Sequence, residues 1–180
     1  ALDPNIATKI KKLDLKRLEQ INRRFSNMGS TSELVNTDLS DNLERVINYL
    51  NRRMPSLGKK VTLINDIESG IFFPLNGSLL AWSIENIVIN SIDSIDNDMG
   101  VVDISLKKVD DRIIIRIKDN GRGIPKKDWR NIFRPGFSTK ATGWGLGLSL
   151  SNRITHDIHK GKIRVVESVQ NKGTLIEIIL

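Results

Sequence analysis

Two glycine clusters in the last third of the chain constrain its fold most strongly. The first, residues 119–123 (Asp-Asn-Gly-Arg-Gly), directly follows an alternating run that predicts a β-strand over residues 112–118. The second, residues 143–148 (Gly-Trp-Gly-Leu-Gly-Leu), directly precedes a run that predicts a helix over residues 148–159. Glycines at such junctions let the backbone turn tightly and bring N–H groups close to a ligand. A strand end, a glycine-rich lid and a helix N-terminus together favour a nucleotide site.

A third element, over residues 79–95, precedes these clusters. Its apolar residues recur at helical spacing and predict a buried stripe. Asn86, Asn90 and Asp93 are spaced i, i+4 and i+7, so a helix places all three on one face. Amide oxygens on one helix face can hold Mg²⁺ or its bound water, as a magnesium–nucleotide complex requires. For this helix alone, a solvated polar stripe is an equally good interpretation.

Four motifs occur in one order along the chain. They are Asn86-x3-Asn90, Asp119-x-Gly121-x-Gly123, residues 132–140 (Ile-Phe-Arg-Pro-Gly-Phe-Ser-Thr-Lys) and Gly143-x-Gly145-x-Gly147. Together they resemble the N box, first glycine box, F box and second glycine box of the catalytic, ATP-binding domain of sensor histidine kinases, within the GHKL superfamily. The Phe-Ser-Thr-Lys ending looks most like the nitrogen-regulation branch of that family. The resemblance covers roughly residues 38–180.

The resemblance implies a site for ATP and Mg²⁺. Asp119 would accept a hydrogen bond from the adenine amino group, and Ile124 would be an apolar wall for adenine or a core residue. Asn90 would be the Mg²⁺ ligand, and we expect Asn90 and Lys140 to act in catalysis. The expected nucleotide site comprises Asn86, Asn90, Asp119, Gly121, Gly123, Ile124, Thr139, Lys140, Gly143, Gly145, Leu146 and Gly147.

The remaining patterns predict an α+β fold, a two-layer α/β sandwich preceded by an N-terminal helix. A helix is expected over residues 39–54, capped by Asp38 or Ser40 and ended by Pro55. Strands are expected over residues 61–67, 101–109, 112–118, 162–167 and 174–180, with hairpin turns at 110–111 and 171–173.

The N-terminal helix is predicted over residues 6–28, where apolar residues follow the 3–4 spacing of a helical-bundle seam. The resemblance assigns residues 1–30 to the second helix of a dimerisation and phosphoacceptor hairpin, and residues 31–180 to the catalytic domain. An amphipathic helix packed on the catalytic domain is the alternative. His156 and His159 fall at the end of a predicted helix, so we expect the acceptor histidine to lie in a domain absent from this chain.

Composition excludes several functional classes. Cysteine is absent, which rules out disulfides and thiolate sites, and two neighbouring histidines do not suffice for structural zinc. Residues 1–60 hold 12 Lys and Arg against 7 Asp and Glu, so most of the net charge of +7 lies there. No basic stripe is interleaved with aromatic residues, and nucleic acid is not an expected partner. No apolar run approaches the ~20 residues that span a bilayer. The absence of cysteine fits a reducing, cytoplasmic setting, and we expect this chain to be the cytoplasmic part of a sensor that another segment could anchor to the membrane.

The activity that the resemblance implies is transfer of the ATP γ-phosphoryl group to a histidine of a dimerisation domain. The expected partners are that phosphoacceptor domain, a response-regulator receiver domain and, in the full-length protein, a second copy in a homodimer. A GHKL-type ATPase or a partner-regulated serine kinase is the alternative, and a non-catalytic ATP-binding scaffold ranks third. The ATPases and serine kinases of this superfamily usually carry a glutamate four residues before the magnesium asparagine, where this chain has Asn86. Glu85 would point about 100° away around the helix.

Overall fold

The computed structural model describes residues 33–57, 60–96, 99–139 and 145–180. The chain divides into two units, Ala1–Glu33 and Leu34–Leu180, and the described residues belong almost wholly to the second. The helix predicted over residues 6–28 lies outside the described residues, and so do Lys140 and Gly143 of the expected site. Within the described ranges, no helix is both long enough and apolar enough to cross a membrane.

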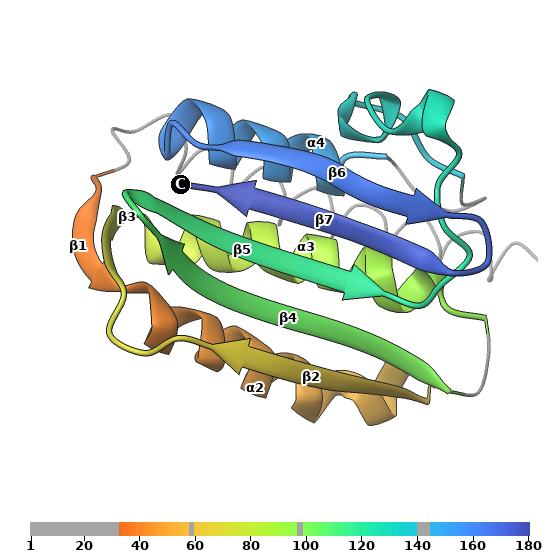
Figure 1. The fold of residues 1–180 in the computed structure, drawn as a ribbon, viewed down its shortest axis with the longest axis horizontal. Coiled ribbons are helices and arrows are strands. Elements are labelled where there is room, and N and C mark those ends of the chain that lie inside the picture. Colours follow the sequence, from red (N-terminus) through yellow and green to blue (C-terminus); the bar gives the residue numbers. More distant parts are fainter. Residues whose placement is uncertain (1–32, 58–59, 97–98, 140–144) are drawn as a thin grey trace, which may run out of the picture. The chain divides into compact units, whose positions relative to one another are not determined.

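A five-stranded sheet forms one layer of the second unit, in the order β2-β4-β5-β7-β6 (Figure 1). Its strands are β2 Val61–Ile67, β4 Gly100–Val109, β5 Arg112–Asp119, β6 Lys162–Val169 and β7 Gly173–Ile179. Neighbouring strands are antiparallel except β2 and β4, which run parallel. All five predicted strands are therefore confirmed, with small differences at their ends.

Helices α2 (Leu39–Leu57), α3 (Gly77–Ser94) and α4 (Gly147–Arg153) cover one face of this sheet, and α4 continues into a π-helical turn, Ile154–Ile158 (Figure 1). Asp38 caps α2, because its Oδ1 accepts the Asp41 N–H at 3.1 Å. The predicted end of α2 at Pro55 is wrong. A proline removes one backbone donor but its φ suits a helix, so the last turn can continue past it.

A short antiparallel pair, β1 (Val35–Asp38) with β3 (Phe72–Leu75), was not predicted. Each strand has only 4 residues, which is too short for an alternating pattern to stand out. Pro74 lies within β3, and proline in a run argues against a strand unless the strand is at a sheet edge. The pair forms its own two-stranded sheet beside the start of α2.

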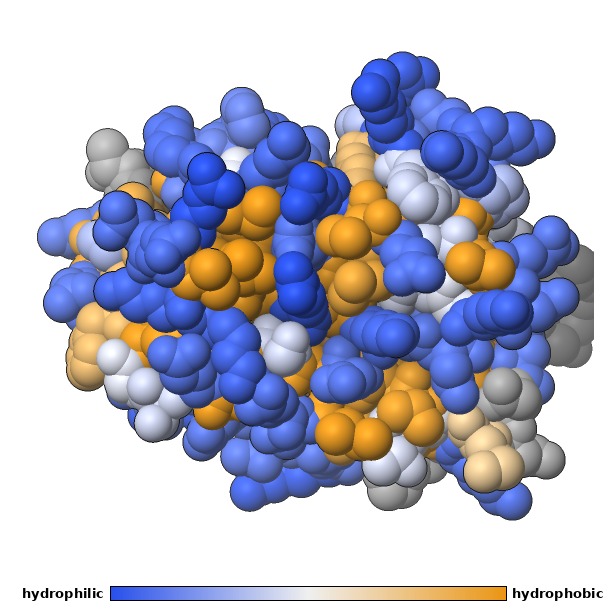
Figure 2. Space-filling model, in the orientation of Figure 1, coloured by the Kyte–Doolittle hydropathy of each residue, from blue (hydrophilic) through white to orange (hydrophobic). Residues whose placement is uncertain are grey.

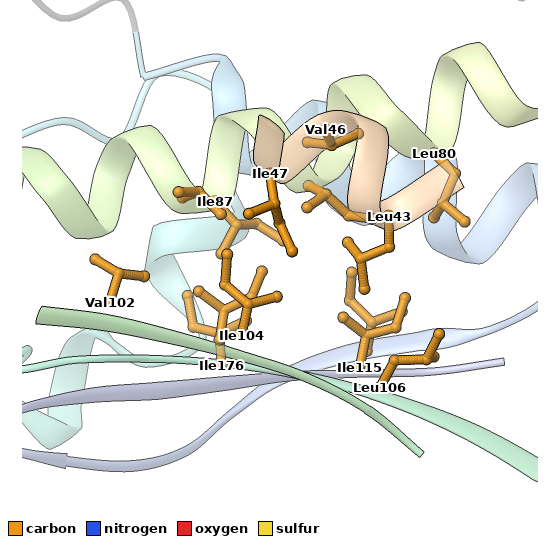
Figure 3. Packing of buried hydrophobic residues seen from close by; sticks show 14 of the residues in the cluster. Leu43, Val46, Ile47, Leu80, Ile87, Val102, Ile104, Leu106, Ile115 and Ile176 are labelled. Atoms are coloured by element: carbon orange, nitrogen blue, oxygen red, sulfur yellow. The ribbon is translucent and has the colours of Figure 1, made fainter. Parts of the chain in front are cut away.

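The hydrophobic core lies between the helices and the sheet (Figure 3). Helices α2 and α3 contribute Leu43, Ile47, Leu80 and Ile87, and the sheet contributes Val102, Ile104, Leu106, Ile115 and Ile176. Burying one such side chain stabilises the fold by about 1.5–3 kcal/mol. This packing fixes α3 against β4 and β5, which places the helix that carries the two asparagines beside the strand that ends at Asp119.

On the opposite face of the sheet, apolar side chains lie on either side of a hydrophilic band (Figure 2). Glu177 of β7 accepts hydrogen bonds there from Arg116 Nε at 2.8 Å and Arg164 Nη2 at 2.7 Å. Burial opposes the ionisation of Glu177, which is only 2% exposed, but the two arginines outweigh it and lower its pKa. This cross-strand cluster therefore ties β5, β7 and β6 together with an ionised carboxylate.

Candidate functional site

Asp119, the last residue of β5, is a buried carboxylate with several hydrogen-bond donors around it. It is 5% exposed. Its Oδ1 accepts hydrogen bonds from the Gly121 N–H at 2.9 Å, the Thr174 N–H at 3.2 Å and the Ser94 hydroxyl at 3.3 Å. Burial raises the pKa of Asp119, and hydrogen bonds from these groups and from Ser91 partly offset that effect. The acid is thus rigidly held inside the domain at a strand end.

The turn after Asp119 packs so tightly that only glycine fits at two positions. A Cβ on Gly121 would overlap the Ser94 hydroxyl and lie 2.7 Å from the Ser94 carbonyl oxygen. A Cβ on Gly123, whose φ is +75°, would overlap the carbonyl oxygen of Val169. The first glycine cluster therefore brings the backbone directly against the end of α3 and the end of β6.

The segment between the two glycine clusters, which we call the lid, begins immediately after this turn. The Ile124 N–H donates to Ser168 Oγ at 2.7 Å, and the Trp129 indole N–H donates to the Ile124 carbonyl at 3.0 Å. Ile124 is half-buried and packs against the core. Core packing, one of the two roles open for Ile124, is therefore what the structure shows, and a contact with a base stays a prediction.

The lid is anchored to the core and to the second glycine cluster. Phe133 and Phe137 are partly buried against the core and anchor the lid there. The Gly136 N–H donates to the Gly145 carbonyl at 3.0 Å. Gly145 has φ of +63°, and a Cβ there would lie 2.6 Å from the Phe137 nitrogen. Thr139 is exposed at the end of the described part of the lid.

Asn86 of α3 faces the first turn of α4. A Cβ added to Gly147 would lie 3.6 Å from Asn86 Oδ1. Asn86 Nδ2 is buried and has no hydrogen-bond partner among the described residues. A buried donor left in this state costs about 1–3 kcal/mol, so it is suited to bind an oxygen of a ligand. The first N–H groups of α4, near Leu146 and Gly147, also have no partner within the helix.

Asn90 and Asp93 follow along α3, and both are half-buried. Within the described ranges, no group of three or more His, Cys, Asp or Glu side chains could hold a metal ion. A cation bound at this helix would therefore take amide, water and ligand oxygens rather than a cluster of carboxylates. Such a set suits Mg²⁺ that arrives with a nucleotide, because this ion keeps several waters and binds phosphate oxygens.

Glu85 is directed away from this region. Its Oε1 lies 3.0 Å from Arg53 Nη1 of α2, and its side chain is only 19% exposed. The acid next to Asn86 in the sequence is therefore bound to the neighbouring helix. This geometry confirms the expectation from helical spacing, and it does not favour a role for Glu85 in activating water.

The two histidines lie at the end of the helix, as predicted. His159 is buried, its Nδ1–H donates to the Ile154 carbonyl at 2.9 Å, and its Nε2 accepts the Asn76 N–H at 3.1 Å. Burial lowers the pKa of His159. His156 is exposed, and its Nδ1 lies 3.0 Å from Asp157 Oδ1. His159 thus links the end of this helical segment to the N-cap of α3.

Residues 77–180 match the family model described as "Histidine kinase-, DNA gyrase B-, and HSP90-like ATPase". The chain belongs to this family. Sensor protein kinase WalK of Staphylococcus aureus is 30% identical over 165 residues, which are 87% of this chain and 39% of that protein. AtoS of Escherichia coli, a signal transduction histidine-protein kinase, is 36% identical over 123 residues, which are 67% of this chain and 20% of that protein.

Another relative, sporulation kinase C of Bacillus subtilis, is 37% identical over 95 residues, which are 53% of this chain and 22% of the kinase. The chain spans between a fifth and two fifths of the length of these three relatives. These matches show that the chain carries the ATP-binding catalytic domain of the sensor histidine kinase type, and the family implies ATP as the nucleotide.

Solved structures confirm the predicted fold class. The catalytic domain of the histidine kinase ThkA superposes with a TM-score of 0.70 at 23% identity, over 82% of this chain and 95% of that one. The mycobacterial sensor histidine kinase MprB gives a TM-score of 0.69 at 23% identity, over 82% and 96%. The α+β sandwich is therefore that of histidine kinase catalytic domains.

The motifs did not point to the hydroxyl groups around Asp119. Ser91 is one of the buried residues of α3, where a polar residue among aliphatic ones is a signal in itself. Thr174 follows the glycine of the β6–β7 turn and donates its N–H to Asp119. The described residues fit a nucleotide, because they offer a buried acid at one end and the unpartnered Nδ2 of Asn86 toward the start of α4.

Proposed function

We propose that this chain binds Mg-ATP and transfers the γ-phosphoryl group to a histidine of a dimerisation domain. The observation that carries the proposal is Asp119, a buried carboxylate at the strand end where this family has its first glycine box. Because Oδ1 already accepts three donors, an exocyclic amine that reaches this group would meet Oδ2. Adenine presents such an amine, whereas guanine presents a carbonyl oxygen at the same position.

At the phosphate end, Asn86 would donate Nδ2–H to a phosphate oxygen or to magnesium-bound water. Asn90 would be the Mg²⁺ ligand, and Lys140 would approach the phosphates from the lid. The ion would neutralise charge on the transferred phosphoryl group. The proposed nucleotide site comprises Asn86, Asn90, Asp119, Gly121, Gly123, Ile124, Thr139, Lys140, Gly143, Gly145, Leu146 and Gly147.

We assign residues 1–30 to a dimerisation hairpin helix and residues 31–180 to the catalytic domain. The proposed partners are a phosphoacceptor histidine domain, a second copy in a homodimer and a response-regulator receiver domain. A chain in the solved complex of the histidine kinase ThkA with the response regulator TrrA superposes on this chain with a TM-score of 0.75 at 19% identity. The coverage is 100% of this chain and 52% of that one, and this likeness in fold supports the proposed organisation. The proposed location is the cytoplasm.

Calorimetric titration with ATP and GTP, with and without Mg²⁺, tests the proposal. Asp119→Ala should weaken ATP and ADP binding by about ten- to a hundredfold, since it removes a buried charged hydrogen bond of about 1.5–3 kcal/mol. Asn90→Ala should remove mainly the Mg²⁺-dependent part of the affinity. Asp103→Ala, which removes an exposed acid of β4, is the matched control and should bind as the unaltered chain does. Equal affinity of the unaltered chain for ATP and GTP would contradict the proposal.

Phosphoryl transfer needs its own test. A separately prepared dimerisation domain with an acceptor histidine is mixed with this chain and labelled ATP. Label that appears on the acceptor domain, and that disappears with Asn90→Ala, is the expected result. If the acceptor domain stays unlabelled although the chain binds ATP tightly, the result would indicate that the chain binds the nucleotide without transferring its phosphoryl group.

A further inference from the structure

Two serine hydroxyls of α3 hold the carboxylate of Asp119 in addition to backbone groups. Ser94 Oγ lies 3.3 Å from Asp119 Oδ1. Ser91 is only 4% exposed, and its side chain favours the ionised form of this carboxyl group, which partly offsets the rise in the pKa of Asp119 that burial causes. Gly121 makes room for this arrangement, because a Cβ there would overlap Ser94 Oγ. One buried acid is therefore reached by two side-chain donors from a single helix.

These hydroxyls act on the balance between two forms of Asp119. Burial favours the protonated acid, whereas each donor favours the carboxylate. The Ser94 hydroxyl has a second acceptor, the Ser91 carbonyl at 2.8 Å, and an ionised carboxylate attracts its hydrogen more strongly than a neutral carbonyl does. The backbone donors of Gly121 and Thr174 are set by the fold. The two hydroxyls are therefore the donors of this network that depend on the identity of a side chain and that a substitution can remove.

The form of Asp119 determines which base it can pair with. A carboxylate only accepts hydrogen bonds. It therefore suits the exocyclic amine of adenine and repels the O6 carbonyl of guanine. A protonated carboxyl group also donates one hydrogen bond, and it can pair with O6. Discrimination between the two bases thus depends on keeping the proton off Asp119.

We propose that Ser91 and Ser94 are positioning residues for base selection, whose hydroxyl groups keep Asp119 ionised and oriented so that the site prefers adenine nucleotides to guanine nucleotides. The inference rests on the proposed function, since it assumes that Asp119 receives the base. The charged groups on the surrounding elements are Asp93, Asp96, Asp103, Lys118, Arg122 and Lys172. The pKa of Asp119 is shifted by burial and hydrogen bonds rather than by these charges.

The test is the ratio of ATP affinity to GTP affinity, measured by calorimetry from about pH 8 downward to the lowest pH at which the domain stays folded. Both nucleotides carry the same triphosphate, so the ratio cancels the titration of phosphate and isolates the base. In the unaltered chain, the ratio should fall as the pH falls through the pKa of Asp119. Ser91→Ala and Ser94→Ala should each show this fall at higher pH, and the double variant at higher pH still. Asp119→Asn should give a flat profile, because it removes the ionisable group.

Ser83→Ala is the matched control. Ser83 is a buried serine of the same helix, and its hydroxyl has no hydrogen-bond partner among the described residues. Its replacement should leave the ratio and its pH midpoint unchanged. Thermal unfolding of each variant without nucleotide checks the fold. Ser94→Cys, with a similar size and a weaker donor, gives a smaller shift and replaces Ser94→Ala if that variant does not fold.

The outcomes separate this inference from the proposed function. A pH midpoint that is the same in the unaltered chain and in the serine variants overturns the inference and leaves adenine binding intact. A lower affinity for both nucleotides with an unchanged midpoint would also overturn it, because a merely structural role predicts that result. Equal binding of ATP and GTP by the unaltered chain at every pH would overturn the proposed function, and this inference with it.

Discussion

Replacing His159 by alanine should destabilise the domain strongly at neutral pH. The substitution removes the hydrogen bond from Nδ1 to Ile154 at 2.9 Å and leaves the Asn76 N–H without its acceptor at 3.1 Å. A net hydrogen bond contributes about 1 kcal/mol, and a buried donor left unpaired costs about 1–3 kcal/mol. Together with the cavity, the free energy of unfolding should fall by about 2–4 kcal/mol.

Low pH should weaken the hydrogen bond between His159 and Asn76 in the unaltered protein. Burial lowers the pKa of His159 below its ordinary value of 6.5, so the unfolded chain binds the proton more readily than the folded one. The stability that neutral His159 contributes is therefore complete above pH 6.5 and is lost as the pH falls from there toward the pKa of the folded state. A proton on Nε2 directly prevents that atom from accepting the Asn76 N–H.

Urea unfolding followed by tryptophan fluorescence at about pH 8 and about pH 5.5 measures both effects. The unaltered chain should lose stability between the two conditions, and His159→Ala should lose much less. Asp119 is present in both proteins, so any contribution from its carboxyl group cancels in the difference. His156→Ala is the matched control, since His156 is the other histidine and is exposed. If the unaltered chain and His159→Ala show the same change with pH, the reasoning about His159 is refuted.

Further predictions concern hydrolysis, self-labelling and the outer face of the sheet. Steady release of phosphate from ATP should be negligible, and Asn86→Glu should not create it; robust turnover that Asn90→Ala abolishes would instead indicate an ATPase. Labelled ATP should leave this chain unlabelled, because His156 lies at the far end of the helical segment whose start is proposed to face the phosphates. Acid-labile phosphate on His156, found by mass spectrometry and lost in His156→Gln, would contradict this. Glu177→Gln should lower the free energy of unfolding by about 1–2 kcal/mol near neutral pH. This loss is smaller than for a fully buried ion pair, because both arginine partners are half exposed and solvent screens the interaction. Since the pKa of Glu177 is lowered, the loss should shrink in chemical denaturation as the pH falls through that pKa.

Local patterns predicted the elements that carry their own signal. Alternation in residues 101–109 and 112–118 gave the β4–β5 hairpin, and helical spacing gave α3, because each period reflects which face a residue presents to the core. The turn residue Asp110 adopts φ of +54°, which aspartate tolerates better than most residues. Where the sequence pattern shows which side chains are buried, it also indicates whether the segment is a helix or a strand.

Contacts between distant segments could not be predicted in this way. Nothing near Asp119 in the sequence indicates that Ser94 and Thr174 will meet it, since α3 and β7 reach it only after the sheet has formed. The same is true of His159 and Asn76, which come from opposite ends of two helical segments. Motif spacing therefore predicted the site residues, whereas the groups that hold the Asp119 carboxyl could be found only from the fold.

The turn between β6 and β7 is expected to tolerate insertions less well than surface turns usually do. Insertions and reporter groups are normally best placed in exposed turns. Here, however, the Asn171 N–H donates to the Arg122 carbonyl at 2.9 Å, and a Cβ on Gly173 would overlap the Asp119 carbonyl oxygen. A peptide inserted at residues 171–173 would pull directly on the base end of the proposed site. The turn at residues 110–111, at the other end of β5, is the place for a tag or fluorophore, whereas residues 171–173 suit an insertion meant to make nucleotide binding respond to a second ligand.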